Sequence, residues 1–175
     1  MLFLLPMQMT MGYFYTFFSP LFLALSGANG AKLGWSYFIA AASEIPYLLL
    51  SDRLLERFGA GKLMCASGAF LTARWLILAQ TQSAAVAMLS QLLHGGGFIV
   101  MSVSMAKHIQ KTVPAELKSS GQMLLAMAGY GFARAAGNLL GGTLANAFGR
   151  QNVFFLSAGI CALALAVFTP GMLKK

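Results

Sequence analysis

Residues 84–106 of the chain read AAVAMLSQLLHGGGFIVMSVSMA and contain no aspartate, glutamate, lysine or arginine. Because about 20 consecutive apolar residues suffice for a helix to cross the hydrocarbon core of a bilayer, this stretch predicts a membrane-spanning helix. Its unusual feature is His94, which is followed by three glycines. These glycines do not form a phosphate-binding loop, because the required lysine followed by serine or threonine is missing and no strand precedes them.

Apolar runs of this kind fill almost the whole chain. Of its 175 residues, 58% are hydrophobic and 9% are charged, and the mean hydropathy is +0.73; soluble domains carry far more charge. The other runs lie near residues 1–26, 33–51, 63–80, 120–146 and 153–170. We therefore predict an all-α membrane protein with six transmembrane helices in one domain over residues 1–175, because helices satisfy their own backbone hydrogen bonds in lipid.

The chain begins directly inside its first apolar run. No basic segment precedes this run and no small-residue cleavage site follows it, so we expect a spanning helix and not a signal peptide. Such a start fits the trimmed half of a longer protein as well as a short gene product.

The basic residues are distributed by loop. The formal net charge is +8, but the lysines and arginines form no single stripe of the kind that binds nucleic acid. By the positive-inside rule, the side with more of them is cytoplasmic. Lys32 and Arg150 fall on one side, and the other side holds Arg53, Arg57, Lys62, Lys107, Lys111, Lys118, Lys174 and Lys175. We expect a multi-pass protein of the cell membrane, in bacteria the inner membrane, with both termini in the cytoplasm.

Four ionisable residues fall inside the predicted spans, namely Glu44, Arg74, His94 and Arg134. A charged group at the centre of a membrane helix costs about 2.5–3.5 kcal/mol on insertion scales, so such residues usually face a partner or water. One interpretation is a structural clasp, with Glu44 paired to one arginine and His94 bonded to a backbone carbonyl. That clasp leaves the second arginine unpaired, which favours a site for an anionic or polar ligand.

Two features of the helices point to a cavity and to close packing. Pro46 follows Glu44 by two residues, and we expect it to break the helix and free a carbonyl at membrane depth. Small residues recur at every fourth position and predict a flat helix face, suited equally to tight packing and to sliding. They are Gly129, Ala133, Gly137, Gly141 and Ala145.

Further side chains complete the candidate site. Gln91 lies one helical turn before His94 and is expected to hold one of its ring nitrogens. Tyr13 and Phe17 form an i, i+4 aromatic pair, which serves either core packing or stacking against a substrate ring. Cys65 and Cys161 have no second ligand at metal-binding spacing, so we assign them to packing and predict neither metal nor cofactor.

The polar segment SDRLLERFGAGK, residues 51–62, places Asp52 where a helix C-terminus would disfavour an anion. Arg53, Arg57 or another helix could compensate, and such a charge contact would lock one conformation. A merely solvated carboxylate explains the sequence equally well.

Three segments on consecutive predicted helices resemble the C-terminal half of a major facilitator superfamily transporter. They are SEIPYLLLSDRLLERFG (43–59), ARW (73–75) and QLLHGGGF (91–98). The similarity is strongest to the phenylpropionate permease-like group, which is related to the lactose permease family.

This resemblance implies half of a twelve-helix, proton-coupled symporter with alternating access. Each half of such a protein consists of two inverted three-helix units around a midplane site. Glu44, Arg74, His94 and Arg134 match family residues by helix and type, whereas Gly97 stands where the family has a second glutamate. Glu44 is then the proton-coupling residue. The family admits aromatic acids, sugars and nucleosides as substrates, and the expected partner is a second six-helix half, either in the same protein or in a homodimer.

Two other classes of protein compete with a transporter as interpretations of this sequence. An intramembrane enzyme is disfavoured, because the chain lacks a Gly-x-Ser-x-Gly motif, an aspartate pair and metal-ligand spacing around His94. A nontransporting membrane subunit or truncated remnant remains the alternative, since one half supplies only one wall of a transport pathway.

Overall fold

The computed structural model describes residues 2–173. Met1, which opens the first predicted run, and Lys174 and Lys175, which belong to the predicted cytoplasmic tail, lie outside the described residues. In chain order the elements are α1 (Leu4–Phe22), α2 (Gly30–Gln80), α3 (Ala84–Ser90), α4 (Leu93–Thr112), the 3₁₀ helix η1 (Ala115–Leu117), α5 (Lys118–Leu125), the π-helix η2 (Ala126–Ala133), α6 (Arg134–Phe148) and α7 (Arg150–Leu173). The predicted all-helical fold is confirmed.

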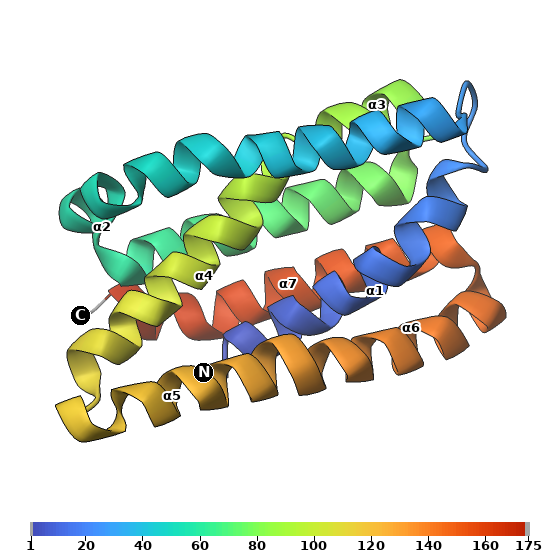
Figure 1. Ribbon diagram of the computed structural model, residues 1–175. Helices are drawn as coiled ribbons and strands as arrows, with labels where there is room; N and C mark the ends of the chain where they lie inside the picture. The colour runs from blue at the N-terminus through green and yellow to red at the C-terminus, as the bar shows by residue number, and fades with distance from the viewer. Residues whose placement is uncertain (1, 174–175) are drawn as a thin grey trace.

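The chain runs back and forth between two ends of the molecule (Figure 1). The bend of α2, the connection from α4 to α5 and the end of α7 lie at one end, on the left. The connections from α1 to α2, from α2 to α3 and from α6 to α7 lie at the other end. There Ser26 N donates to the Gln82 carbonyl at 2.8 Å, and Ala84 N donates to the Ser26 carbonyl at 3.1 Å, so two of these connections are tied together.

Helix α2 covers 51 residues and combines two of the predicted runs. It continues past residue 51 and bends at Gly59, whose φ of 77° is a conformation that glycine adopts without strain. The arm before Gly59 and the arm after it run in opposite directions (Figure 1). Pro46 does not break the helix, so that prediction is wrong: a proline removes one backbone hydrogen bond, and the neighbouring turns maintain the helical path here.

Two other predicted runs differ from continuous α-helices. The run at 84–106 is divided into α3 and α4 at Gln91 and Leu92, and α4 continues to Thr112. The run at 120–146 lies within α5, η2 and α6, so a π-helical segment directly precedes Arg134. Such widened turns are rare and frequently occur at functional sites.

Within residues 2–173, three helical stretches are long and apolar enough to cross a membrane, judged by length and composition. They are Gly30–Gln80, Ala84–Thr112 and Arg150–Gly171. Together with the all-helical fold, they support the prediction of a membrane protein.

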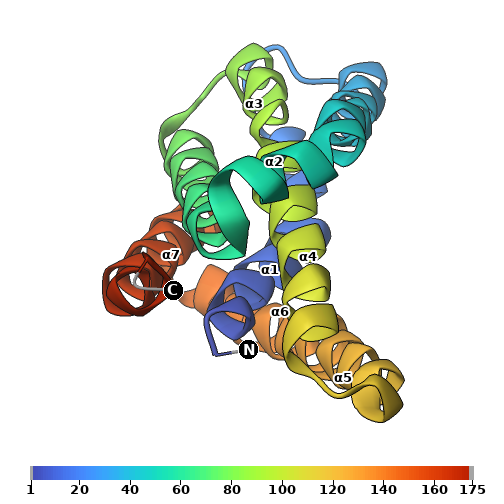
Figure 2. The same cartoon turned by 90° about the vertical axis from the view of Figure 1, so that its left-hand side faces the viewer.

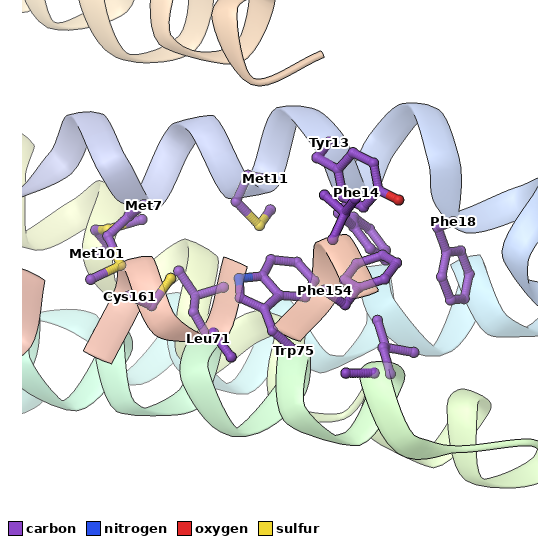
Figure 3. Close-up of a cluster of buried hydrophobic side chains, with 14 of the residues drawn as sticks. Met7, Met11, Tyr13, Phe14, Phe18, Leu71, Trp75, Met101, Phe154 and Cys161 are labelled. Atoms are coloured by element: carbon purple, nitrogen blue, oxygen red, sulfur yellow. The ribbon is translucent and has the colours of Figure 1, made fainter. Parts of the chain in front are cut away.

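The core lies where α1 meets α7 and the second arm of α2, and it is rich in aromatic side chains (Figure 3). Phe14, Trp75 and Phe154 are fully buried or nearly so, with Trp75 5.3 Å from Phe14 and 5.6 Å from Phe154 between ring centroids. Trp75 Nε1 donates to Thr10 Oγ1 at 3.1 Å, which satisfies the polar atom of the indole. Cys161 is buried in the same cluster, as its assignment to packing predicts.

Small residues bring α1 and α6 into close contact. All five residues of the predicted flat face are buried. A Cβ atom at Gly137 would overlap the Met9 carbonyl oxygen, and one at Gly12 would overlap the Arg134 backbone. The end-on view places α1 beside α6, in the interior of the bundle (Figure 2). The predicted close approach is thus confirmed, and it fixes the position of the α6 backbone at Arg134.

The alanine substitution Gly137→Ala tests this contact. We expect it to destabilise the fold by about 1–3 kcal/mol, because the added methyl group has to displace backbone and not a flexible side chain. Thermal unfolding in detergent measures the effect. Gly159→Ala is the matched control, since Gly159 is an exposed helical glycine with no other atoms near its Cβ position, and it should leave stability unchanged or raise it slightly. Equal stability of the two variants would contradict the inferred contact.

Candidate functional site

Four of the predicted site residues form one connected polar network. Glu44 Oε1 lies 3.0 Å from His94 Nε2, and His94 Nδ1 lies 2.7 Å from Arg74 Nη1. Arg74 Nη2 in turn donates to Gln91 Oε1. The two arms of α2 supply Glu44 and Arg74, α4 supplies His94, and Gln91 lies at the junction of α3 and α4. The network therefore forms only when the bend at Gly59 returns the second arm of α2 beside α4.

The donors and acceptors of this network determine the tautomer of His94. A guanidinium group can only donate, so His94 Nδ1 has to accept the hydrogen bond from Arg74. The ring proton is then on Nε2 and is donated to the Glu44 carboxylate. This tautomer is assigned from the hydrogen-bond partners. A doubly protonated ring would direct an N–H group at the guanidinium, so the network selects a neutral imidazole.

Exposure changes steeply along the network. The side chain of Glu44 is 29% exposed and that of His94 is 5% exposed, while Arg74 is completely buried. The Arg74 guanidinium carbon lies 4.1 Å from the centroid of the Phe14 ring, a cation–π contact that compensates part of the lost hydration. Glu44 is thus the end of the network that a ligand or proton can reach.

The glycines after His94 allow α4 to approach both arms of α2. A Cβ atom at Gly95 would overlap the Ser43 carbonyl, and the Gly95 N–H donates to Ser43 Oγ at 2.9 Å. A Cβ at Gly97 would come within 2.8 Å of the Leu71 side chain. These contacts hold the helix backbones close enough for His94 to reach Glu44 and Arg74 at the same time.

Gln91 does not hold the His94 ring directly, which differs from our prediction. The Gln91 side chain folds back along its own helix and its Nε2 donates to the Ala87 carbonyl at 3.1 Å. Its Oε1 accepts a hydrogen bond from Arg74 Nη2. The planar guanidinium group of Arg74 carries several donors and contacts both Gln91 and His94. Arg74 therefore links the two side chains that we predicted would contact each other.

Arg134 lies beside the network without a carboxylate partner among residues 2–173. Its Nε donates to Gln8 Oε1 at 2.9 Å. Its guanidinium carbon lies 4.9, 5.1 and 5.4 Å from the ring centroids of Tyr15, Tyr130 and Phe98. Phe98 connects it to the network, because this ring also stacks on His94 at 5.5 Å.

The predicted aromatic pair of α1 lies elsewhere. Tyr13 and Phe17 stack at 4.8 Å, but Tyr13 is only 2% exposed and its hydroxyl donates to the Arg150 carbonyl at 2.8 Å. Tyr13 faces the core, in agreement with the packing interpretation, and the ring that reaches Arg134 is Tyr15. Sequence reasoning overlooked Tyr15, Phe98, Tyr130 and Gln8 as neighbours of the site. The spacing of four residues between His94 and Phe98 could have indicated that ring.

Asp52 is compensated by a different helix. It lies inside α2 and not at a helix C-terminus, so the expected unfavourable helix-dipole interaction does not apply. Asp52 Oδ1 lies 3.1 Å from Lys107 Nζ of α4, and both side chains are well exposed. Exposed pairs of this kind contribute about 0–1 kcal/mol. Arg57 lies over the ring of Phe58 at 5.3 Å instead of contacting Asp52.

Comparison with known proteins supports a transporter relationship. The model of the MFS_1 like family matches residues 1–156. The chain is 25% identical over 151 residues to the uncharacterized transporter YwbF of Bacillus subtilis (strain 168), covering 85% of this chain and 37% of that protein. It is 24% identical over 137 residues to the maltose permease of Geobacillus stearothermophilus, covering 78% of this chain and 34% of the permease. As expected from the missing catalytic motifs, these relatives are not enzymes.

A solved structure has the same fold. The nucleoside transporter NupG (D323A mutant) matches with a TM-score of 0.79 and 18% identity, over 98% of this chain and 47% of that one. At this identity the match shows the fold alone. The chain spans between about a third and a half of the length of the proteins that it matches.

The tautomer of His94 can be measured directly. The chain has 2 histidines, so a His108→Asn variant leaves His94 as the only imidazole. We expect its ¹⁵N ring resonances at pH 7 to report a neutral ring protonated at Nε2, because Arg74 can only donate to Nδ1. Glu44→Gln is the control, since the amide oxygen can still accept from Nε2. A ring protonated at Nδ1, or at both nitrogens, would be incompatible with the network.

Proposed function

Because the chain belongs to the MFS_1 like family, we propose that it forms half of a secondary active transporter that couples uptake of a small organic solute to protons by alternating access. The observation that carries this proposal is the contact of partly exposed Glu44, through His94, with fully buried Arg74. A purely structural clasp would not need a titratable group exposed at one end of the network. The substrate is expected among the aromatic acids, sugars and nucleosides.

Glu44 is the proposed proton-coupling residue. It is the only acidic side chain in the polar network, and its carboxylate accepts a hydrogen bond from the Nε2–H group of His94. Protonation of Glu44 would remove the negative charge and weaken this hydrogen bond, since bonds to charged acceptors are the stronger ones. The His94 ring would then be free to change its contact with Arg74. Proton binding at the exposed end is thereby linked to the arrangement of the buried end.

Arg74, His94, Gln91 and Arg134 are the proposed substrate-binding residues. The first three supply a chain of polar atoms, and Arg134 adds a cation on the far side of Phe98. Tyr13 and Phe17 have only a supporting role in substrate binding in this proposal, because the Tyr13 side chain is buried in the core.

The proposed assembly is a six-helix half that pairs with a second six-helix half. The chain covers 47% of the full-length neighbour structure, which supports a missing companion of similar size, in the same protein or as a second copy. Polar side chains are also exposed on α1, α2 and α6, including the hydrogen-bonded pairs Thr16–Asn138 and Ser19–Tyr37. Lipid offers such groups no hydrogen-bond partners, so a companion half or a water-filled pathway is the more favourable neighbour. Each half would contain two inverted three-helix units.

The proposed orientation places both termini and the bend at Gly59 in the cytoplasm. The segments with most basic residues meet at one end of the molecule, together with the end of α7 (Figure 1). At this end, Asp52 with its neighbours Arg53 and Arg57 is proposed to form a conformational lock. The Asp52–Lys107 pair between α2 and α4 supports it, because relative movement of the two helices would separate these charges.

The alternative function is a membrane subunit or remnant that does not transport. It is supported by the partial coverage of its relatives, because the chain aligns with only 37% of the YwbF transporter and 34% of the maltose permease. Solute flux in proteoliposomes, with and without a companion half, distinguishes the two functions: a remnant would give no flux in either preparation.

The substitution Glu44→Gln tests proton coupling. We expect it to abolish uphill accumulation driven by a pH gradient while counterflow exchange continues, because the amide keeps the hydrogen-bond acceptor for His94 and loses the titratable group. Both rates are measured in proteoliposomes that contain both halves. Glu56→Gln is the matched control, since Glu56 is an exposed acid of the same helix outside the network. Unchanged accumulation in Glu44→Gln would exclude the proposed coupling role.

The substitution His94→Ala tests the link between Glu44 and Arg74. It removes both ring nitrogens, so substrate binding should weaken by about tenfold or more, the effect of losing one hydrogen bond to a charged group. Counterflow as a function of substrate concentration measures this change. Unaltered affinity would assign His94 to packing alone.

Single cysteines at Lys32 and Lys111, in a background without Cys65 and Cys161, test the orientation. Both lysines are exposed. Lys32 is near the start of α2 and Lys111 is near the end of α4, and these two helix ends lie at opposite ends of the molecule (Figure 1). In intact cells a membrane-impermeant reagent should label the cysteine at position 32 and spare the one at 111. The reverse pattern would invert the topology.

A further inference from the structure

A small cavity lies between the two arms of α2 and α4, in the part of the structure between the polar network and the bend at Gly59. Its volume is about 10 Å³, which is close to the space that one water molecule requires. The lining combines leucine and valine side chains with three residues that carry hydroxyl groups, Tyr47, Ser51 and Ser104. The cavity is therefore not purely apolar.

The Ser104 hydroxyl group is buried without a hydrogen-bond partner. Ser104 is 1% exposed, and its Oγ has no partner among residues 2–173. Other buried serines, such as Ser67 of α2 and Ser90 of α3, donate to a carbonyl three or four residues earlier in the chain. Leaving a buried hydroxyl unpaired is costly, and ordered water is the usual partner of such a group.

The other two hydroxyl groups of the cavity are also free to bind water. The side chains of Tyr47 and Ser51 make no hydrogen bond with any residue of the described range 2–173. A buried water molecule needs about 2–4 polar partners. The cavity offers three hydroxyl groups, each of which can both donate and accept. It therefore has the size and the polar groups of a site for a single water molecule.

Tyr47 lies between the cavity and the polar network. A Cβ atom at Gly95, the residue after His94, would come within 2.8 Å of Tyr47 Cδ2, so the tyrosine ring packs against this part of α4. Tyr47 and Ser51 follow Glu44 by three and seven residues, which places all three on one side of the helix. Ser51 is then about 10 Å from Glu44 along the helix axis, and Tyr47 lies within that interval.

The opposite side of the cavity leads toward solvent. Ser51 directly precedes Asp52, and Ser104 comes one helical turn before Lys107. Asp52 and Lys107 form the exposed ion pair between α2 and α4. The free hydroxyl groups therefore lie between an ion pair in contact with solvent and the carboxylate of Glu44.

We propose that the cavity binds one water molecule between Ser51 and Ser104, and that this water and the Tyr47 hydroxyl carry protons between Glu44 and the end of the molecule with the α2 bend. Each member can accept a proton on its oxygen and release its own proton to the next member, so every O–H bond that breaks is replaced by one that forms. This proposal rests on the proposed function, in that it identifies the route by which Glu44 exchanges its proton on this side.

The His94 ring is less suited to this role. Its Nδ1 accepts the hydrogen bond from Arg74, and its Nε2–H is donated to Glu44. Transfer of a proton through the ring would break the contact with the buried guanidinium. The hydroxyl groups of the cavity take no part in the polar network, so protons can move along them while that network stays intact.

Water at Ser104 can be detected by NMR transfer of magnetisation from water to the intact protein in lipid nanodiscs. We expect a water contact at Ser104 although this residue is almost completely buried. Ser67 is the matched control, since it is equally buried and donates to carbonyls of its own helix, and it should show no water contact. The absence of a water contact at Ser104 would overturn the proposal, whatever the transport activity.

The substitutions Ser104→Ala and Tyr47→Phe test the proton route in proteoliposomes that contain both halves. Each removes one hydroxyl group and retains the rest of the side chain. We expect each to slow uptake driven by a pH gradient by about tenfold or more while counterflow exchange continues, because counterflow requires no net movement of protons. Ser67→Ala removes a buried hydroxyl outside the cavity and should change neither rate. Unchanged proton-driven uptake in both variants, or an equal loss of counterflow, would exclude the route.

These results are distinguishable from the test of Glu44. Loss of accumulation in Glu44→Gln together with normal uptake in Ser104→Ala and Tyr47→Phe would support the proposed function and exclude this proton route. A water contact at Ser104 in a protein that accumulates no solute would support the water site and exclude both the proton route and the proposed function.

Discussion

The rest of this structure depends on the burial of the Arg74 guanidinium. A permanently charged group in an apolar bundle needs acceptors within hydrogen-bond reach and a polarisable surface over its face. Gln91 and His94 supply the acceptors, and Phe14 supplies the surface. Because these residues come from α1, the α3–α4 junction and α4, the helices have to converge at this point. Gly95 and Gly97 permit that convergence, since a larger residue at either position would meet α2.

The hydrogen bond of Arg74 also determines the arrangement at the exposed end of the network. Its hydrogen bond uses the Nδ1 lone pair of His94, so the ring proton is on Nε2 and is presented to Glu44. The buried Arg74 guanidinium keeps its proton and thereby orients the His94 ring toward the Glu44 carboxylate. In the proposed function, Arg74 positions the His94 ring and Glu44 exchanges the proton, so a change at Glu44 would reach Arg74 through one imidazole ring.

The two arginines have different environments because their helices pack differently. Arg74 lies on the buried face of the second arm of α2, where it is completely enclosed. Arg134 lies on α6 immediately after the π-helical η2, beside the close contact of Gly12 with its backbone. That contact brings α1 so near that Tyr15 and Gln8 reach the Arg134 side chain, while Tyr13 turns to the core. Two tyrosines two residues apart on α1 thus take different roles, because successive positions of a helix point in different directions.

The sequence by itself determined the membrane character, the helical fold, the positions of the ionisable residues within apolar runs and the small-residue face of 129–145. Each of these follows from properties that act along the chain: transfer of apolar side chains from water, backbone hydrogen bonding within one helix, and side-chain size at fixed helical spacing. The tertiary structure alone decided that α2 passes Pro46 and bends at Gly59, that Gln91 pairs with Arg74, that Asp52 pairs with Lys107, and that Tyr15 lies at the site. These outcomes depend on distances of a few ångströms between residues far apart in sequence, and such distances are fixed only when the helices pack.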